Sequence, residues 1–315
     1  MSGKTRANEL HIVRFYDAPL ATVWEAWTDP DQAAKWWGPR GFTITTHGKD
    51  LRPGGHWSYT MHGPDGTDYP NKAIYLEVEH QAKLVYDHGG NDDRPPLFRV
   101  TVLFSEESGR TKMDMTMALP TAKAAAETRV FIKKAGGDGT WDRLAEYLEK
   151  GASGKEIFVI NRSFDAPIDL VFDCWTDPAR IAQWLPPADF TMEFSKADIR
   201  SGGSSAYRMG NAGLTMYGRA NYIAVERPRR LVYTQQFSDE KGNVARHPLA
   251  PTWPETMLTV VTFTPLESGG TLVTIRWEVS GPATAEEMAT FIAGRNGMTQ
   301  GWTSSLDKFE AMLKP

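Results

Sequence analysis

The hydrophobic and polar positions of this chain follow two kinds of pattern. Residues 10–15 alternate weakly between apolar and polar side chains, which indicates a strand. Val23 and Trp27 then lie on one apolar face at helical spacing. The pair Asp29-Pro30 suits the N-cap and the first position of another, shorter helix. The pattern therefore predicts a strand followed by two helices.

A series of further strands follows, and glycine, proline and aspartate residues separate its members. The stretches that favour strands are residues 42–46, 57–61, 72–78, 83–87, 98–104 and 111–117. Such a series is typical of an antiparallel meander. A last helix is expected after it. In the second half of the chain this helix has a capping box signature at Thr284 and Glu287.

The same order of motifs occurs twice, with an offset of 148 positions over much of its length. Trp27-Thr28-Asp29-Pro30 returns as residues 175–178, and the motif D-x-R-x-G-G of residues 50–55 returns at 198–203. An ordered set of repeats indicates two homologous units. We predict an α+β chain with domains at residues 1–150 and 155–315. Gly151-Ala152-Ser153-Gly154 would join them as a short flexible linker.

These motifs resemble those of a known family. The residues that carry the resemblance are 17–19, 27–30, 36–37, 50–55 and 84–86 in the first half, and 165–167, 175–178, 198–203 and 301–302 in the second. Each half resembles the START-like, or SRPBCC, superfamily, and within it the domain shared with the activator of the Hsp90 chaperone ATPase. The resemblance implies a helix-grip (Bet v1-like) fold, in which a curved antiparallel sheet wraps around a long C-terminal helix and leaves a cavity.

The two halves differ in two places. The second half has an insertion from Asp239 to Pro254 before the strand that starts at Met257. The first half has Gly136-Gly137 where the second has Gly301-Trp302, so we expect its final helix to be shortened around Gly139. These differences suggest two different pockets, or one working pocket and one structural copy.

The resemblance places one face of the strands against the cavity. Trp57, Tyr59 and Met61 share a face at a period of two, and Ser205 stands in the second half where Trp57 stands in the first. Aromatic and methionine side chains there would form an apolar, adaptable wall, although core packing is the alternative for each residue. The candidate pocket residues are Trp27, Trp57, Tyr59, Met61, His88 and Met115 in the first half, and Trp175, Tyr207, Met209, Tyr233, Trp277 and Trp302 in the second.

No convergent catalytic set is visible in the sequence. The pairs Asp50/Arg52 and Asp198/Arg200 favour a structural role, because an aspartate beside an arginine has a lowered pKa and is a poor general acid. Cys174 lies among apolar residues, which predicts a buried and inert thiol. We therefore predict no catalytic residue, no metal site and no cofactor.

The charge and composition of the chain argue against some classes of partner. The net charge is −4, so there is no excess of positive charge for a nucleic acid. No apolar run of about 18 residues exists that would span a membrane. A single cysteine suits a reducing cytoplasm. Eleven tryptophans exceed what a plain core needs, so we expect the two domains to pack on each other through rings such as Trp36, Trp37 and Trp253.

Three functions compete at this point. A binding protein for a small apolar or aromatic molecule fits the expected cavity best. An enzyme of the cyclase or hydrolase kind, which the superfamily also contains, would need a polar pair such as His56 with Asp50 in the cavity, or His56 or His88 as a single general base. A chaperone cofactor is disfavoured, because a second copy of the domain occupies the length that the eukaryotic activators give to their chaperone-binding domain.

Overall fold

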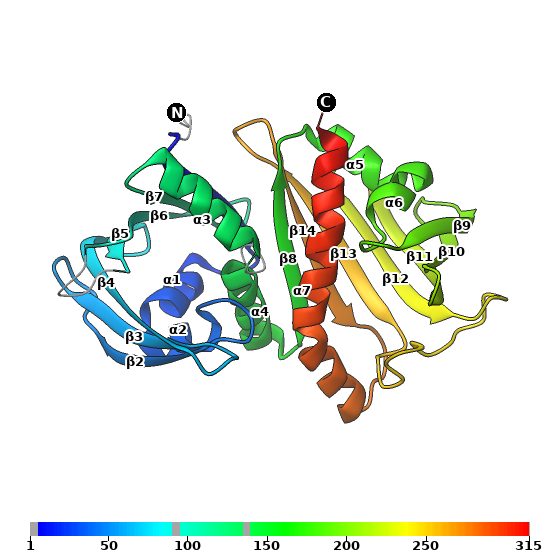
Figure 1. Ribbon diagram of the computed structural model, residues 1–315, viewed down its shortest axis with the longest axis horizontal. Helices are drawn as coiled ribbons and strands as arrows, with labels where there is room; N and C mark the ends of the chain where they lie inside the picture. Colours follow the sequence, from blue (N-terminus) through cyan, green and yellow to red (C-terminus); the bar gives the residue numbers. More distant parts are fainter. Residues whose placement is uncertain (1–5, 90–94, 135–138, 315) are drawn as a thin grey trace. The chain divides into compact units, whose positions relative to one another are not determined.

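The computed structural model describes residues 6–89, 95–134 and 139–314. The chain divides into two compact units, Met1–Gly154 and Lys155–Pro315. Each unit consists of one antiparallel sheet with helices against it, which makes the chain an α+β protein with two copies of one architecture (Figure 1). No helix in the described part of the chain is long and apolar enough to cross a membrane.

The first unit is built around a sheet of seven strands in the order β1-β7-β6-β5-β4-β3-β2. Its strands are β1 (Glu9–Tyr16), β2 (Thr43–Lys49), β3 (His56–His62), β4 (Asp68–Glu79), β5 (Lys83–His88), β6 (Phe98–Glu107) and β7 (Arg110–Ala118). Its helices are α1 (Leu20–Thr28), α2 (Pro30–Trp36), α3 (Ala122–Lys134) and α4 (Gly139–Ser153). Consecutive strands from β2 to β7 pair with each other, so the predicted meander is confirmed.

The second unit repeats this topology in a sheet ordered β8-β14-β13-β12-β11-β10-β9. Its strands are β8 (Ile157–Phe164), β9 (Thr191–Ala197), β10 (Ser204–Gly210), β11 (Thr215–Glu226), β12 (Arg230–Ser238), β13 (Met257–Pro265) and β14 (Thr271–Val279). Its helices are α5 (Ile168–Thr176), α6 (Pro178–Trp184) and α7 (Ala285–Leu313). The predicted insertion lies between β12 and β13, and we call residues 239–256 the strap.

The two short helices of each unit are fixed by the same local chemistry. Asp29 caps α2 by accepting a hydrogen bond from the backbone N–H of Gln32 at 2.8 Å, as its position before a proline predicts. The indole N–H of Trp36 donates to the carbonyl of Ala26 at 3.0 Å. The second unit repeats this bond between Trp184 and Cys174. Because these contacts tie each helix pair together, both pairs pack on their sheets as single blocks.

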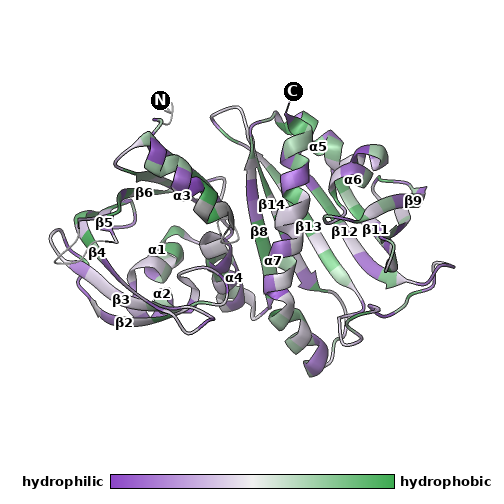
Figure 2. Ribbon diagram, viewed as in Figure 1, coloured by the Kyte–Doolittle hydropathy of each residue, from purple (hydrophilic) through white to green (hydrophobic). Residues whose placement is uncertain are grey.

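The two units differ in the helices that follow their last strand. The first unit has one helix there that the sequence pattern did not predict. The second unit closes with the single helix α7, which carries hydrophilic and hydrophobic residues along its length and lies along its sheet (Figure 2). The first unit has α3 and α4 instead, both shorter than α7, and α4 begins at Gly139 as expected. An alanine-rich stretch favours α3. The Gly136-Gly137 pair lies outside the described residues.

The expected linker is partly helical, so that prediction is wrong in its first three residues. Helix α4 continues through Ser153, whose hydroxyl donates to the carbonyl of Glu149 at 3.0 Å. Gly154 ends the helix with a φ of +73°, and its N–H donates to the carbonyl of Lys150 at 2.9 Å. A glycine in the left-handed region just after a helix is a common helix stop.

The capping box of α7 is expected to contribute to the stability of the second unit. Thr284 accepts from the N–H of Glu287 at 3.1 Å, and the Glu287 carboxylate accepts from the N–H of Thr284 at 2.8 Å. Thr284→Ala is expected to lower the free energy of unfolding of the second unit by about 1 kcal/mol in urea unfolding, because it leaves an N–H without its cap. Thr303→Ala, the same change inside α7, is the control. Equal losses in both variants would show that the cap contributes nothing specific.

The tryptophans proposed to join the two domains are covered within their own units, so that premise is wrong. Trp36 is fully buried and Trp37 is 8% exposed, and both rings contact Trp141 of the same unit. Trp253 packs edge-on against Phe291 of α7, with their centroids 6.0 Å apart. These rings therefore need no second domain to cover them.

Candidate functional site

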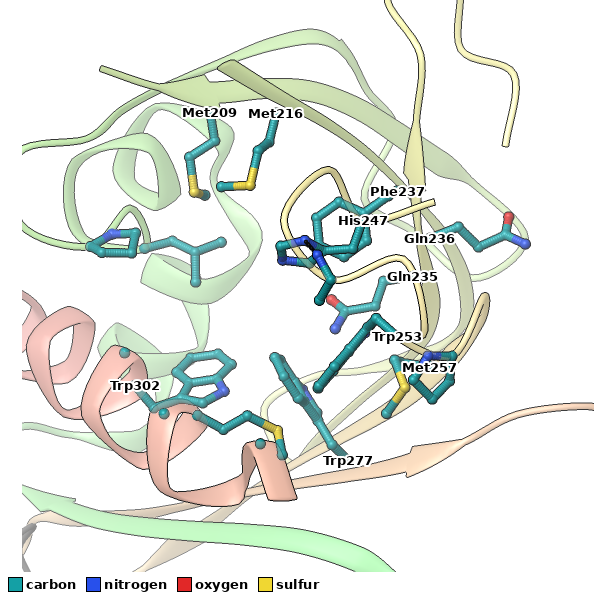
Figure 3. Close-up of a pocket in the computed structure, with 18 of the residues that line it drawn as sticks. Met209, Met216, Gln235, Gln236, Phe237, His247, Trp253, Met257, Trp277 and Trp302 are labelled. Carbon is teal, nitrogen blue, oxygen red and sulfur yellow. Dashed lines mark hydrogen bonds between the residues drawn. The ribbon is translucent and has the colours of Figure 1, made fainter. Parts of the chain in front are cut away.

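A cavity of about 500 Å³ lies in the second unit. Its wall consists of side chains from β10 to β14, from α7, from the strap and from the segment after α6 (Figure 3). Most of the labelled side chains around it are aromatic rings and methionines: Met209, Met216, Phe237, Trp253, Met257, Trp277 and Trp302. A concave site of this size with a mostly apolar wall has the usual character of a small-molecule site.

Small residues on one face of α7 make room for the cavity. Thr290, Gly294, Gly297, Gly301 and Ser305 line it and recur at helical spacing. A Cβ added at Gly297 or Gly301 would meet no heavy atom within 4 Å, so both positions border open space. A Cβ at Gly294 would lie 3.1 Å from the Trp253 ring, so this glycine lets the strap approach the helix closely.

Two equivalent positions differ in size between the two units near this site. In the first unit the rings of Trp37 and Trp57 contact each other with centroids 5.1 Å apart, and the Trp37 indole donates to the hydroxyl of Tyr59 at 3.1 Å. The residues 148 positions later are Leu185 and Ser205. Two large rings are therefore replaced by two smaller side chains. Leu185 lines the cavity, whereas Ser205 is buried and its hydroxyl forms a hydrogen bond with that of Tyr222 at 3.1 Å.

Five of the six residues predicted for the second pocket line this cavity. They are Tyr207, Met209, Tyr233, Trp277 and Trp302. The sixth, Trp175, lies behind the wall and stacks on Trp302, with centroids 6.0 Å apart and planes at 14°. Trp175 thus supports the wall and does not form it.

The residues predicted for the first pocket pack into one another. Trp27, Trp57, Tyr59 and Met115 are all buried in the core of the first unit. Trp27 stacks on Trp141 with centroids 5.2 Å apart and planes at 7°, which repeats the stacking of Trp175 on Trp302. These four side chains of the first unit therefore form part of a packed core.

The remaining two candidates of the first unit are partly buried at the edge of this core. Met61 packs against it, and its methyl group lies 3.2 Å from where a Cβ of Gly38 would be. His88 stacks on Phe98 with centroids 4.9 Å apart. Burial lowers the pKa of His88 to about 4, so the ring is neutral at pH 7.

Several residues that line the cavity were not predicted as site residues. Phe237, His247 and Trp253 come from the end of β12 and from the strap, and Met298 comes from α7. For His247 and Trp253 the sequence contained one signal, namely the length of the insertion and the tryptophan within it, whereas Phe237 and Met298 lie outside the insertion. Nothing in the sequence indicated that this insertion folds over the sheet.

Two tyrosine hydroxyls of the wall are neutral at pH 7. Burial raises the pKa of Tyr207 to about 12, and it raises the pKa of Tyr233 further, so both hydroxyls stay protonated. Among the residues that line the cavity, the single residue with a formal charge is Glu255, which is exposed. The cavity therefore offers hydrogen bonds without a compensating charge.

The pairs considered for acid–base chemistry lie elsewhere. Asp50 pairs with Arg52 at 2.8 Å and Asp198 with Arg200 at 2.9 Å, which is the structural role predicted for them. His56 is exposed, so it does not form a polar pair inside a cavity. Within the described ranges no three histidine, cysteine, aspartate or glutamate side chains cluster as a metal site would require.

Cys174 is buried, as predicted. Its sulfur accepts a hydrogen bond from the guanidinium of Arg180 at 3.3 Å. It lies on α5 within the core and does not line the cavity.

Both halves of the chain are similar to known proteins. A family model described as Activator of Hsp90 ATPase homolog 1-like protein matches residues 17–149 and again residues 165–314. Among solved structures, a protein from Arthrobacter aurescens is 26% identical over 50% of this chain and 85% of its own, with a TM-score of 0.43. An AHSA1-like protein from Aeromonas hydrophila is 26% identical over 45% of this chain and 94% of its own, with a TM-score of 0.37. A protein from Mycobacterium smegmatis is 24% identical over 50% and 90%, with a TM-score of 0.43.

No curated protein matches the chain. The two family matches nevertheless cover almost all of it and coincide with the two units of the fold. The chain belongs to the family of activator of Hsp90 ATPase homolog 1-like proteins, and it carries two copies of the family domain in tandem.

Proposed function

We propose that this protein binds a small apolar or aromatic molecule in the cavity of its second unit. The observation that carries the proposal is a hollow of about 500 Å³ with aromatic and methionine walls, in a place where the first unit is filled by tryptophans. A guest that buries about 200 Å² of its apolar surface in the cavity gains about 5 kcal/mol of binding free energy, before the entropy cost of binding is subtracted. That gain supports binding of a ring system without any ionic contact.

The wall supports an aromatic guest over a purely aliphatic one. The rings of Trp277 and Trp302 meet nearly edge-on, with centroids 5.6 Å apart and planes at 70°, and together they form a corner of the cavity. Aromatic pairs add to the energy of area burial when they stack or meet edge-to-face. Methionine side chains around this corner can adapt to the outline of a guest.

A larger side chain on α7 that fills part of the cavity tests the proposal. Nile red, an uncharged aromatic dye, is expected to bind the full chain with an increase and a blue shift of its fluorescence. Gly301→Leu places a side chain in open space inside the cavity, and it is expected to weaken dye binding at least about tenfold. Gly151→Leu adds the same side chain to α4, where a Cβ also meets no atom within 4 Å, and it is expected to leave binding unchanged.

The outcome separates binding in the cavity from binding to the surface. If Gly301→Leu and Gly151→Leu bind the dye as the unchanged chain does, then the dye lies elsewhere and the proposal is wrong. Circular dichroism of both variants verifies that the helices remain folded.

We further propose that residues 1–150 and 155–315 act as separate domains in the cytoplasm. Two separate cores, each with its own sheet and helices, support the division. The buried unpaired thiol of Cys174 is compatible with a reducing compartment. Limited proteolysis tests the division, since cleavage is expected near Gly154 before either core is attacked.

A further inference from the structure

The strap places one histidine at the cavity in a defined protonation state. The Nδ1 atom of His247 accepts hydrogen bonds from the backbone N–H groups of Leu249 at 3.0 Å and Ala250 at 3.1 Å. A backbone N–H can only donate, so Nδ1 carries a lone pair and the neutral ring holds its hydrogen on Nε2. Burial also lowers the pKa of His247, which favours the neutral ring.

The same histidine presents a free donor. No hydrogen bond joins Nε2 of His247 to any residue that the structure describes, and the ring lines the cavity. Phe237 and Trp253 hold the ring in place, with centroids 4.5 Å and 6.5 Å from that of the imidazole. Figure 3 shows His247 in the middle of the view, among the labelled wall residues. Its Nε2–H can therefore donate to a guest.

A second donor comes from β12. Gln235 lines the cavity, and its side-chain amide has no hydrogen-bond partner in the described part of the chain. Its amide points toward the centre of the view, on the same side as His247 (Figure 3). The next residue, Gln236, also lines the cavity, but its amide points away from the centre and donates to the hydroxyl of Thr256 at 2.9 Å. Two adjacent glutamines thus differ in role, as alternation along a strand requires.

Contacts with α7 fix the strap that carries His247. The guanidinium of Arg246 pairs with the carboxylate of Glu287 at 2.5 Å, and the hydroxyls of Thr252 and Thr290 are 2.9 Å apart. The pairing with Glu287 also neutralises the positive charge of Arg246 beside the cavity. A donor held by such contacts loses little conformational entropy when it binds.

The charges of the lining residues determine whether a charged or a neutral acceptor on the guest suits the two donors. No lysine or arginine is among the residues that line the cavity, so a carboxylate guest would lose its hydration without gaining a counter-ion. A carbonyl oxygen is neutral and has two lone pairs, one for each donor. We propose that the cavity selects an uncharged aromatic molecule that carries a carbonyl oxygen, which accepts hydrogen bonds from His247 Nε2–H and from the Gln235 amide. This inference rests on the proposed function and names the class of ligand for the same site.

Three naphthalenes of similar size test the inference by calorimetry on the full chain: acetylnaphthalene, ethylnaphthalene and naphthoate. Acetylnaphthalene is expected to bind about tenfold more tightly than ethylnaphthalene, which has no acceptor, and naphthoate is expected to bind most weakly. Gln235→Leu combined with His247→Leu is expected to remove the preference for the ketone while ethylnaphthalene still binds. Gln183→Leu, at an exposed position of α6 that does not line the cavity, is the control and is expected to keep the preference.

The possible results separate this inference from the proposed function. If ethylnaphthalene or naphthoate binds the unchanged chain as tightly as acetylnaphthalene does, the selection for a carbonyl is wrong, while binding in the cavity stands. If the double variant keeps the preference for the ketone, then His247 and Gln235 are not the groups that recognise its carbonyl oxygen. If none of the three compounds binds while Nile red does, this inference is wrong and the proposed function stands; if Nile red does not bind either, both are wrong.

Discussion

Replacing Trp37 with leucine and Trp57 with serine is expected to lower the free energy of unfolding of the first unit by about 5 kcal/mol. These are the residues that the second unit has at the equivalent positions, Leu185 and Ser205. Both tryptophans are buried, and the Nζ atom of Lys49 lies 4.2 Å from the centroid of the Trp57 ring. Removing two rings from a packed core loses their burial and leaves a cavity. Urea unfolding measures the loss.

The single variant Trp57→Ser keeps the test usable if the double variant does not fold, and it is expected to lose about 3 kcal/mol. Leu103→Ala is the control, because that side chain is 46% exposed and its removal is expected to change stability by less than about 0.5 kcal/mol. A loss below about 1 kcal/mol in both tryptophan variants would mean that the ring cluster is not what fills the first unit.

The stability of the first unit is expected to fall by up to about 3 kcal/mol between pH 7 and pH 4 through His88 alone. The pKa of His88 is about 4 in the folded chain because of burial, against 6.5 for the exposed ring. In this range the unfolded chain binds a proton that the folded chain does not, so acid favours unfolding. Above pH 7 the ring is neutral in both states and this contribution is constant.

His88→Gln isolates the effect of this ring, because carboxylates titrate equally in both proteins. Glutamine is also what the second unit has there, since Gln235 pairs with Met257 as His88 pairs with Phe98. The variant is expected to show a shallower loss of stability from pH 7 to pH 4 in urea unfolding. His56→Gln, whose ring is exposed before and after unfolding, is the control. Equal slopes for His88→Gln and the unchanged chain would contradict the assignment.

The fold could be predicted from the sequence because its signals are local and occur twice. Alternating strands, the Asp29-Pro30 helix start and the capping box at Thr284 all lie where the pattern put them. The part that the pattern missed is α3. We expected a single closing helix in each unit, and an alanine-rich stretch with few apolar side chains carries little periodic signal for a second one.

The site could be predicted only in part. The period of two in β10 puts Tyr207 and Met209 on one face, and the family resemblance implied that this face lines the cavity; both residues line it. The same argument in β3 placed Trp57 and Tyr59 on the concave face, where they fill the space instead. Periodicity says which face a side chain is on, but the volume left over depends on all the rings that meet there. His247 was missed because it depends on how the strap folds, and that has no periodic signal.

A methionine methyl NMR titration of the full chain with ethylnaphthalene tests most directly whether the second unit alone is hollow. The chain has 12 methionines, and those that line the cavity are Met209, Met216, Met257 and Met298. Met113, Met115 and Met117 report on the core of the first unit. We expect the methyl signals of the first group to shift and those of the second group to stay unchanged. Shifts confined to the first unit, or none in either group, would contradict a binding cavity in the second unit.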